Sequence, residues 1–210
     1  MKKYILAGLC LLATSNVSAD QLSWAQLLPV NVPTIEDPFV ELTDEQRFEL
    51  VSLAKYRLSE NLNEDQRQTM EDIKQRLEFD GLDIEWLFSK SEEVANYRRK
   101  LASLPNENLK EDTYEIPGFV TPVEFDDEVV TTFFLVPTVG ACIHTPPPPA
   151  NQIVLVSYPK GLKLNSLNDP IWVKGDLKIQ KTKADVTYSD GAADVETIYQ
   201  MNNVSVRPYR

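Results

Sequence analysis

The sequence predicts an α+β protein, in which an N-terminal segment of about three helices packs with a small C-terminal antiparallel β-barrel of OB-like type. Between residues 43 and 104, apolar residues recur at the spacing of a helix face. Beyond residue 106 they fall into short runs rich in β-branched and aromatic residues, separated by turn residues. Five such runs, with glycines at the bends, are typical of a small closed barrel.

The helices are placed by their capping residues. Thr43 and Gln46 form a capping-box pattern, and Gly81 stands where a left-handed residue ends a helix. The expected helices are residues 43–59, Asn63 to the residue before Gly81, and Ser91 to Leu104. The first has an apolar face made of Phe48, Leu50, Val51, Leu53, Ala54 and Leu58. Such stripes are more often helix–helix core than binding sites.

The β-rich half is expected to contain five strands, at residues 113–121, 129–136, 151–158, 170–180 and 197–207. Residues 20–38 are broken by three prolines and are expected to lie as an irregular arm across the body. The chain therefore divides into residues 1–19, an arm and helical region at 20–110 and a β-rich domain at 111–210.

Residues 1–19 have the pattern of a cleavable signal peptide. Lys2 and Lys3 precede an apolar stretch, and Val17 to Ala19 end in small residues suited to signal peptidase. The apolar stretch is shorter than the roughly 20 residues that span a bilayer, and no later stretch is longer. We therefore expect a periplasmic protein that begins near Asp20 and has no transmembrane segment.

Charge and cysteine content exclude several classes of protein. The chain carries 32 acidic against 21 basic residues, a net charge of −11. A protein this acidic repels phosphate backbones, so nucleic acid is not an expected partner. Of the two cysteines, Cys10 falls in the signal peptide. Only Cys142 remains in the mature chain, so an intramolecular disulfide is impossible and stability must come from an ordinary core.

The segment from Gly140 to Gln152 is the most unusual part of the sequence, because it joins Cys142 and the chain's single histidine, His144, to four prolines. In an extended backbone, residues i and i+2 leave the same face, so one ion can touch both side chains. A thiolate and an imidazole together favour zinc or copper. The predicted metal ligands are Cys142 and His144, and the predicted binding loop is Gly140, Pro146, Pro147, Pro148, Pro149, Asn151 and Gln152.

Other interpretations of this segment stand beside zinc binding. The Cys142–His144 pair also matches a thiolate–imidazolium couple, which would make the protein a cysteine-dependent enzyme. Alternatively, the protein is a non-catalytic interaction module, in which the proline loop and the arm present a surface to an envelope partner. In the plainest interpretation of the segment, Cys142 is a small buried side chain and the prolines close a loop. Zinc needs further ligands, and the acidic turn at Glu124–Glu128 is the nearest candidate in the sequence. A non-enzymatic role is favoured.

The stretch from Val136 to Val154, which contains Gly-Ala-Cys-Ile-His, four prolines and Asn-Gln, resembles the signature of an uncharacterised family of exported bacterial proteins and lipoproteins. Blocks at 24–29, 116–123, 133–136 and 170–175 are also similar to that family. The resemblance implies no established reaction. Some members are encoded near ABC-type transport genes, sometimes in zinc-responsive settings, so the resemblance implies a role in metal homeostasis or with an envelope transport complex.

Overall fold

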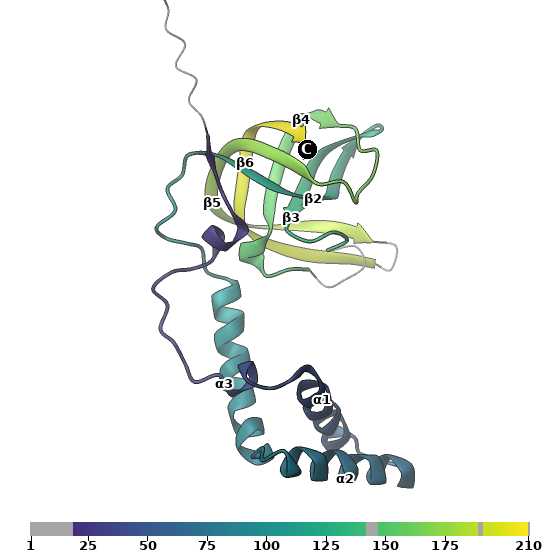
Figure 1. Cartoon of the computed structure of the whole chain (residues 1–210). Helices are drawn as coiled ribbons and strands as arrows, with labels where there is room; N and C mark the ends of the chain where they lie inside the picture. The colour runs from purple at the N-terminus through teal and green to yellow at the C-terminus, as the bar shows by residue number, and fades with distance from the viewer. Residues whose placement is uncertain (1–18, 142–146, 189–190, 210) are drawn as a thin grey trace, which may run out of the picture.

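A computed structural model gives the fold of the chain and describes residues 19–141, 147–188 and 191–209. The α+β class is confirmed: three α-helices precede a closed barrel of five strands, to which one short strand is added (Figure 1). The helices are α1 (Asp44–Leu58), α2 (Glu64–Phe79) and α3 (Ile84–Ala102), and the strands are β1 (Asp20–Gln21), β2 (Thr113–Asp126), β3 (Val129–Val136), β4 (Val154–Leu162), β5 (Ile171–Tyr188) and β6 (Gly191–Pro208). Three short 3-10 helices, η1 (Trp24–Leu27), η2 (Pro38–Val40) and η3 (Ala150–Gln152), complete the elements.

The barrel closes by pairing β2 with β5, which lie at opposite ends of the order β2-β3-β4-β6-β5. Most neighbours are antiparallel, as expected, but β4 and β6 run parallel. The prediction of an antiparallel barrel was therefore wrong for the β4–β6 pair. The chain crosses from β4 to β5 before β6 returns beside β4, and the residue pattern of a strand does not record the direction of its neighbour.

The first two helices lie where the sequence places them. Thr43 accepts a hydrogen bond from Gln46 N at 3.2 Å, Asn63 caps α2, and Gly81 has φ +82°. The prediction for α3 was wrong: it begins at Ile84, capped by Asp83, rather than at Ser91. Ser91 is inside this helix, and its hydroxyl donates to Phe88 O at 2.7 Å, whereas the oxygen of an N-cap accepts from a backbone N–H.

The helices and the barrel have separate hydrophobic cores. Buried side chains of α1, α2 and the start of α3 form one cluster, and none of them belongs to the barrel cluster. Figure 1 shows α1 and α2 projecting away from the barrel, with the C-terminal end of α3 next to it. The expectation that the helices pack with the barrel therefore holds only at that end. Below, α1, α2 and α3 are called the helical unit.

Residues of the arm connect the two parts. β1 adds to the barrel sheet beside β2, the Trp24 indole N–H donates to Pro117 O at 2.7 Å, and farther along, Asp37 pairs with Arg98 of α3 at 2.6 Å. The turn η3 lies within the β-rich half, so the helical turns are not all N-terminal. Within the ranges that the structure describes, no helix combines the length and apolarity needed to cross a bilayer.

Candidate functional site

The segment chosen from the sequence leaves the barrel between β3 and β4. Gly140 is in the left-handed region with φ +73°, a conformation that favours glycine. Ala141 follows, buried, and its carbonyl accepts a hydrogen bond from the buried Thr121 hydroxyl at 2.9 Å. Cys142, His144 and Pro146 lie outside the described residues. The chain that leads to them is therefore fixed to β2 at its start.

The far end of the segment is fixed as well. Pro147 is exposed, Pro148 is half-buried and Pro149 precedes η3. The hydroxyl of the buried Thr197 on β6 donates to Ile153 O at 2.6 Å. Both ends of the predicted loop are thus held by buried threonine hydroxyls from the barrel.

Asn151 and Gln152 bind parts of the chain itself. The Asn151 side-chain amide donates to Leu101 O at 2.8 Å and to Leu104 O at 3.0 Å, at the C-terminal end of α3. The last carbonyls of a helix lack their usual partners four residues on, so this amide adds a hydrogen bond at the end of α3, where Leu101 O also accepts from Leu104 N at 3.2 Å. Gln152 Nε2 donates to Trp24 O of η1 at 3.0 Å. Asn151 is 1% exposed, and among the described residues its Oδ1 has no hydrogen-bond partner.

A second polar junction, which the sequence analysis missed, joins the arm to the barrel. Tyr199 on β6 is fully buried, and its hydroxyl donates to Leu27 O and accepts from Asn106 N, both at 2.7 Å. Burial raises the pKa of the Tyr199 phenol, so it stays neutral and able to donate. In sequence this tyrosine is one apolar residue of a strand, and no local pattern marks its partners.

A closed metal site cannot be built from the residues that the structure describes, since no three His, Cys, Asp or Glu side chains gather there. The acidic residues between Glu124 and Glu128 form the end of the β2–β3 hairpin, where Glu124 accepts a hydrogen bond from Thr132 Oγ1 at 2.6 Å. The prediction of zinc at Cys142 and His144 therefore stays a prediction.

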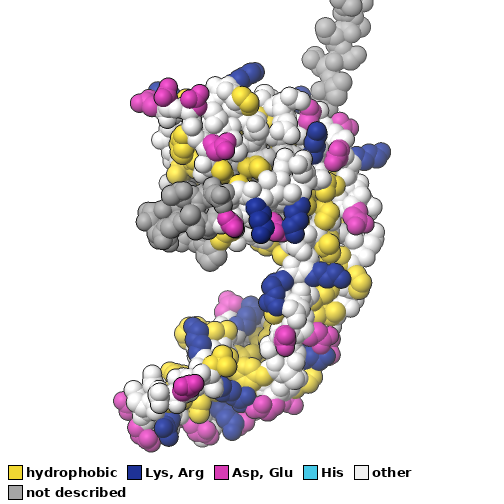
Figure 2. Space-filling view, turned by 180° about the vertical axis from the view of Figure 1, so that it is seen from behind, with side chains coloured by type: hydrophobic (Ala, Val, Ile, Leu, Met, Phe, Trp, Pro, Cys, Tyr) yellow, Lys and Arg dark blue, Asp and Glu magenta, His cyan; other side chains and the backbone are white. Residues whose placement is uncertain are grey.

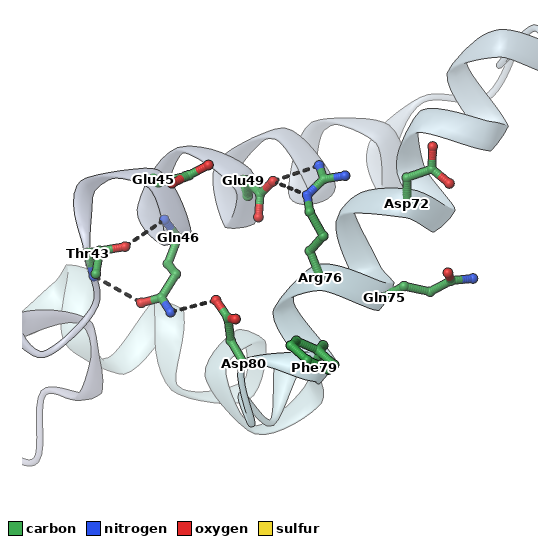
Figure 3. A pocket seen from close by; sticks show the side chains of 9 residues that line it. All are labelled: Thr43, Glu45, Gln46, Glu49, Asp72, Gln75, Arg76, Phe79 and Asp80. Carbon is green, nitrogen blue, oxygen red and sulfur yellow. Dashed lines mark hydrogen bonds and ion pairs between the residues drawn. The ribbon is translucent and has the colours of Figure 1, made fainter.

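A groove of about 780 Å³ lies between α1 and α2 and is lined mainly by polar side chains (Figure 3). Arg76 contacts Glu49 at 2.6 Å, and Gln46 donates to Asp80 at 3.0 Å. These groups satisfy one another across the groove. Phe79, at 91% exposed, lines one side of it.

A smaller groove of about 310 Å³ lies between α1, α3 and η2, and its lining is mostly apolar. The lining residues are Phe39, Arg47, Leu50, Val51, Ala54, Phe88, Ser91 and Arg98. On α1 the apolar surface continues outward, because Phe48, Val51 and Leu58 are 74%, 53% and 85% exposed. The six residues expected to form the apolar face of α1 are therefore not all covered, since these three are exposed. We call this groove and the three exposed side chains the α1–α3 surface.

Fold and site define a class: a closed β-barrel that carries a helical extension. The chain belongs to the family described as "Protein of unknown function (DUF3299)", whose sequence profile matches residues 24–208. Among solved structures, a DUF3299 family protein from Pseudomonas aeruginosa PAO1 is similar over 92% of this chain and 97% of its own, with 26% identity and a TM-score of 0.50. No curated protein matches the chain.

Proposed function

We propose that this protein is an exported, non-catalytic interaction protein of the cell envelope, in which the barrel serves as a base and the helical unit as the arm that docks a partner. The observation that carries the proposal is the exposure of Phe48, Val51 and Leu58 on a helix whose neighbouring Leu50 and Leu53 are buried. Exposed apolar residues that stand singly are ordinary, whereas a contiguous apolar patch marks an interaction site.

The way the helical unit is built supports the same role. Its core is its own, and the bonds from Asn151 to α3 and from Asp37 to Arg98 hold it to the rest of the chain. An element that folds on a separate core can present a side face without weakening the barrel. Figure 2 shows a hollow between the helical unit and the barrel, with hydrophobic side chains gathered on the helical unit beside it.

Two finer assignments belong to this proposal. We assign the barrel to the OB-like type, which is a small five-stranded Greek-key barrel; the closing β2–β5 pair and the crossover that sets β6 beside β4 support this. We also place the mature protein in the periplasm. In support, β1 begins at Asp20, the residue expected to follow signal cleavage. An ABC-type transport component is the envelope partner that the family resemblance suggests.

A photocrosslinking experiment tests the docking role. A photoreactive phenylalanine is placed at Phe48 or Phe79 in the helical unit, and at Phe125, an exposed barrel residue, as the control position. In cells that export the protein, we expect heavier crosslinked products from the helical unit and few from position 125. Products from the barrel position alone, or from none of the three, would contradict the proposal.

Zinc binding at Cys142 and His144 is kept as a second function, because both ends of their segment are fixed by Thr121 and Thr197. A segment held at both ends loses less conformational freedom on binding an ion. Zinc titration of the wild type and of Cys142→Ser tests it, and we expect measurable affinity only in the wild type. Equal, negligible affinity in both proteins would remove this function.

A further inference from the structure

We propose that the α1–α3 surface binds one amphipathic helix of a partner protein, with an acidic residue of that helix placed against Lys55. The inference rests on the proposed docking role and goes further, since it names the surface, the form of the partner segment and its charge. Each of these three points follows from a different property of the surface.

The shape fits a helix. The groove runs along α3 from Phe88 to Arg98, ten residues apart, which corresponds to roughly 15 Å of helix axis. Its other wall is α1, and the two helices are in contact, since the Arg57 guanidinium lies 4.5 Å from the centre of the Phe88 ring. A groove between two helices accepts a third helix that places apolar residues at i, i+3, i+4 and i+7. About ten to twelve residues of partner helix cover this length.

The size of the groove selects side chains rather than a cofactor. At about 310 Å³ it is at the lower end of the range of small-molecule pockets, which is roughly 300–1,000 Å³. It is also open to the exposed stripe on α1, so it suits one or two anchoring side chains of a longer segment. Phe48 and Leu58 then contact the rest of that segment.

The charge of the surface selects an acidic flank. No acidic residue lines the groove, although the chain as a whole carries a net charge of −11. Arg47 and Arg98 line it and are held in place by ion pairs with Asp44 and Asp37. Lys55 lies between Val51 and Leu58 on the exposed face of α1, and within the described residues it forms no ion pair. A carboxylate of the partner is the group that complements it.

The same charge disfavours two other occupants. Two copies of this chain repel each other through their net charge, and an anionic lipid surface repels it too. A second copy, a lipid surface and a partner helix would all use the same apolar contacts. The net negative charge of the chain therefore favours a different protein as the occupant.

Selection from a displayed library of amphipathic helical peptides tests the inference, with the mature chain as bait. We expect enriched peptides to carry apolar residues at helical spacing and an acidic flank. Val51→Glu should weaken their binding by about thirtyfold, as is usual for a hot spot. Phe79→Glu, an apolar-to-acidic change at a more exposed position on α2 outside this surface, should leave it unchanged. Peptides that bind the Val51→Glu variant as well as the wild type would overturn the inference.

A charge exchange tests the contact to Lys55. Lys55→Glu should weaken the selected peptide, and replacing the acidic residue of the peptide by lysine should restore binding to that variant only. If no acidic position of the peptide restores binding when it is replaced by lysine, the proposed contact to Lys55 is overturned. Dimers that Val51→Glu abolishes, or flotation with vesicles of phosphatidylethanolamine and phosphatidylglycerol, would assign the surface to a second copy or to lipid instead. Crosslinks from Phe79 but not from Phe48 would retain the docking role and refute this surface.

Discussion

Removal of one buried hydroxyl should measurably loosen the connection between the arm and the barrel. Tyr199→Phe keeps the ring and deletes only the oxygen, which donates to Leu27 O and accepts from Asn106 N at 2.7 Å each. One backbone carbonyl and one backbone N–H then lose their partner in a buried place. Each such group costs about 1–3 kcal/mol, so the expected loss is roughly 2–6 kcal/mol of unfolding free energy. That is a large part of the roughly 5–15 kcal/mol that stabilises a typical protein.

Urea unfolding followed by circular dichroism measures this loss. Tyr158→Phe is the matched control, because Tyr158 is a half-buried tyrosine of β4 that packs against the same core, and its hydroxyl has no hydrogen-bond partner among the described residues. We expect the control to stay within about 0.5 kcal/mol of the wild type. A Tyr199→Phe variant that is as stable as the control would refute the assignment of this tyrosine as the residue that joins arm and barrel.

Three further predictions concern the barrel and its junction with α3. The hydrogen bond from Arg207 lowers the pKa of Glu115, so this pair should stabilise the fold at neutral pH and lose its effect as pH falls below the usual range of glutamate. Glu115→Gln should therefore lower the melting temperature at pH 7 but not at acid pH. An equal decrease at both pH values would contradict this. Gly118→Ala should destabilise by about 1–3 kcal/mol in thermal unfolding, because its Cβ would lie 2.8 Å from Val136 O and from a Leu135 carbon. Asn151→Asp places a carboxylate against the carbonyls of Leu101 and Leu104 at the end of α3, so limited proteolysis should cut near residue 104 sooner than in the wild type. An unchanged rate would refute the capping role.

The sequence was a good guide wherever structure is decided locally. The capping residues Thr43 and Asn63 and the left-handed Gly81 are specified by neighbours within a few residues, and all three are as predicted. β3 also has the predicted bounds, because its run of β-branched and aromatic residues ends sharply on both sides. Ser91 is not a cap, because a serine inside a helix can also bond the backbone, by donating its hydroxyl to a carbonyl of the preceding turn.

Longer-range features escaped the sequence analysis. The hairpin of β5 and β6 extends well past the predicted residues 170–180 and 197–207. In its outer part the two strands pair only with each other and carry charged residues such as Lys183 and Glu196, so the sequence there lacks the apolar pattern of a strand in a core. The separate cores were also missed, since an apolar stripe does not say which element covers it. Phe48 illustrates the point: it belongs to the apolar pattern of α1, yet no described element covers it.

The candidate site shows the same division. Composition alone draws attention to the segment from Gly140 to Gln152, but the bonds of Asn151 to α3 and of Gln152 to Trp24 depend on residues far away in the chain. Judged from the neighbouring sequence alone, an amide side chain in a proline-rich loop suggests ligand binding. The structure gives both amides partners within the chain, and it moves the search for a partner surface to the helical unit.

The most direct test of the docking role is the affinity for the protein recovered by crosslinking at position 48, compared between the wild type and Val51→Glu in the purified mature chain. A dissociation constant raised by about tenfold or more in the variant, with Phe79→Glu unchanged, is the expected result. The same dissociation constant in all three proteins would mean that the apolar side of the helical unit does not dock a partner.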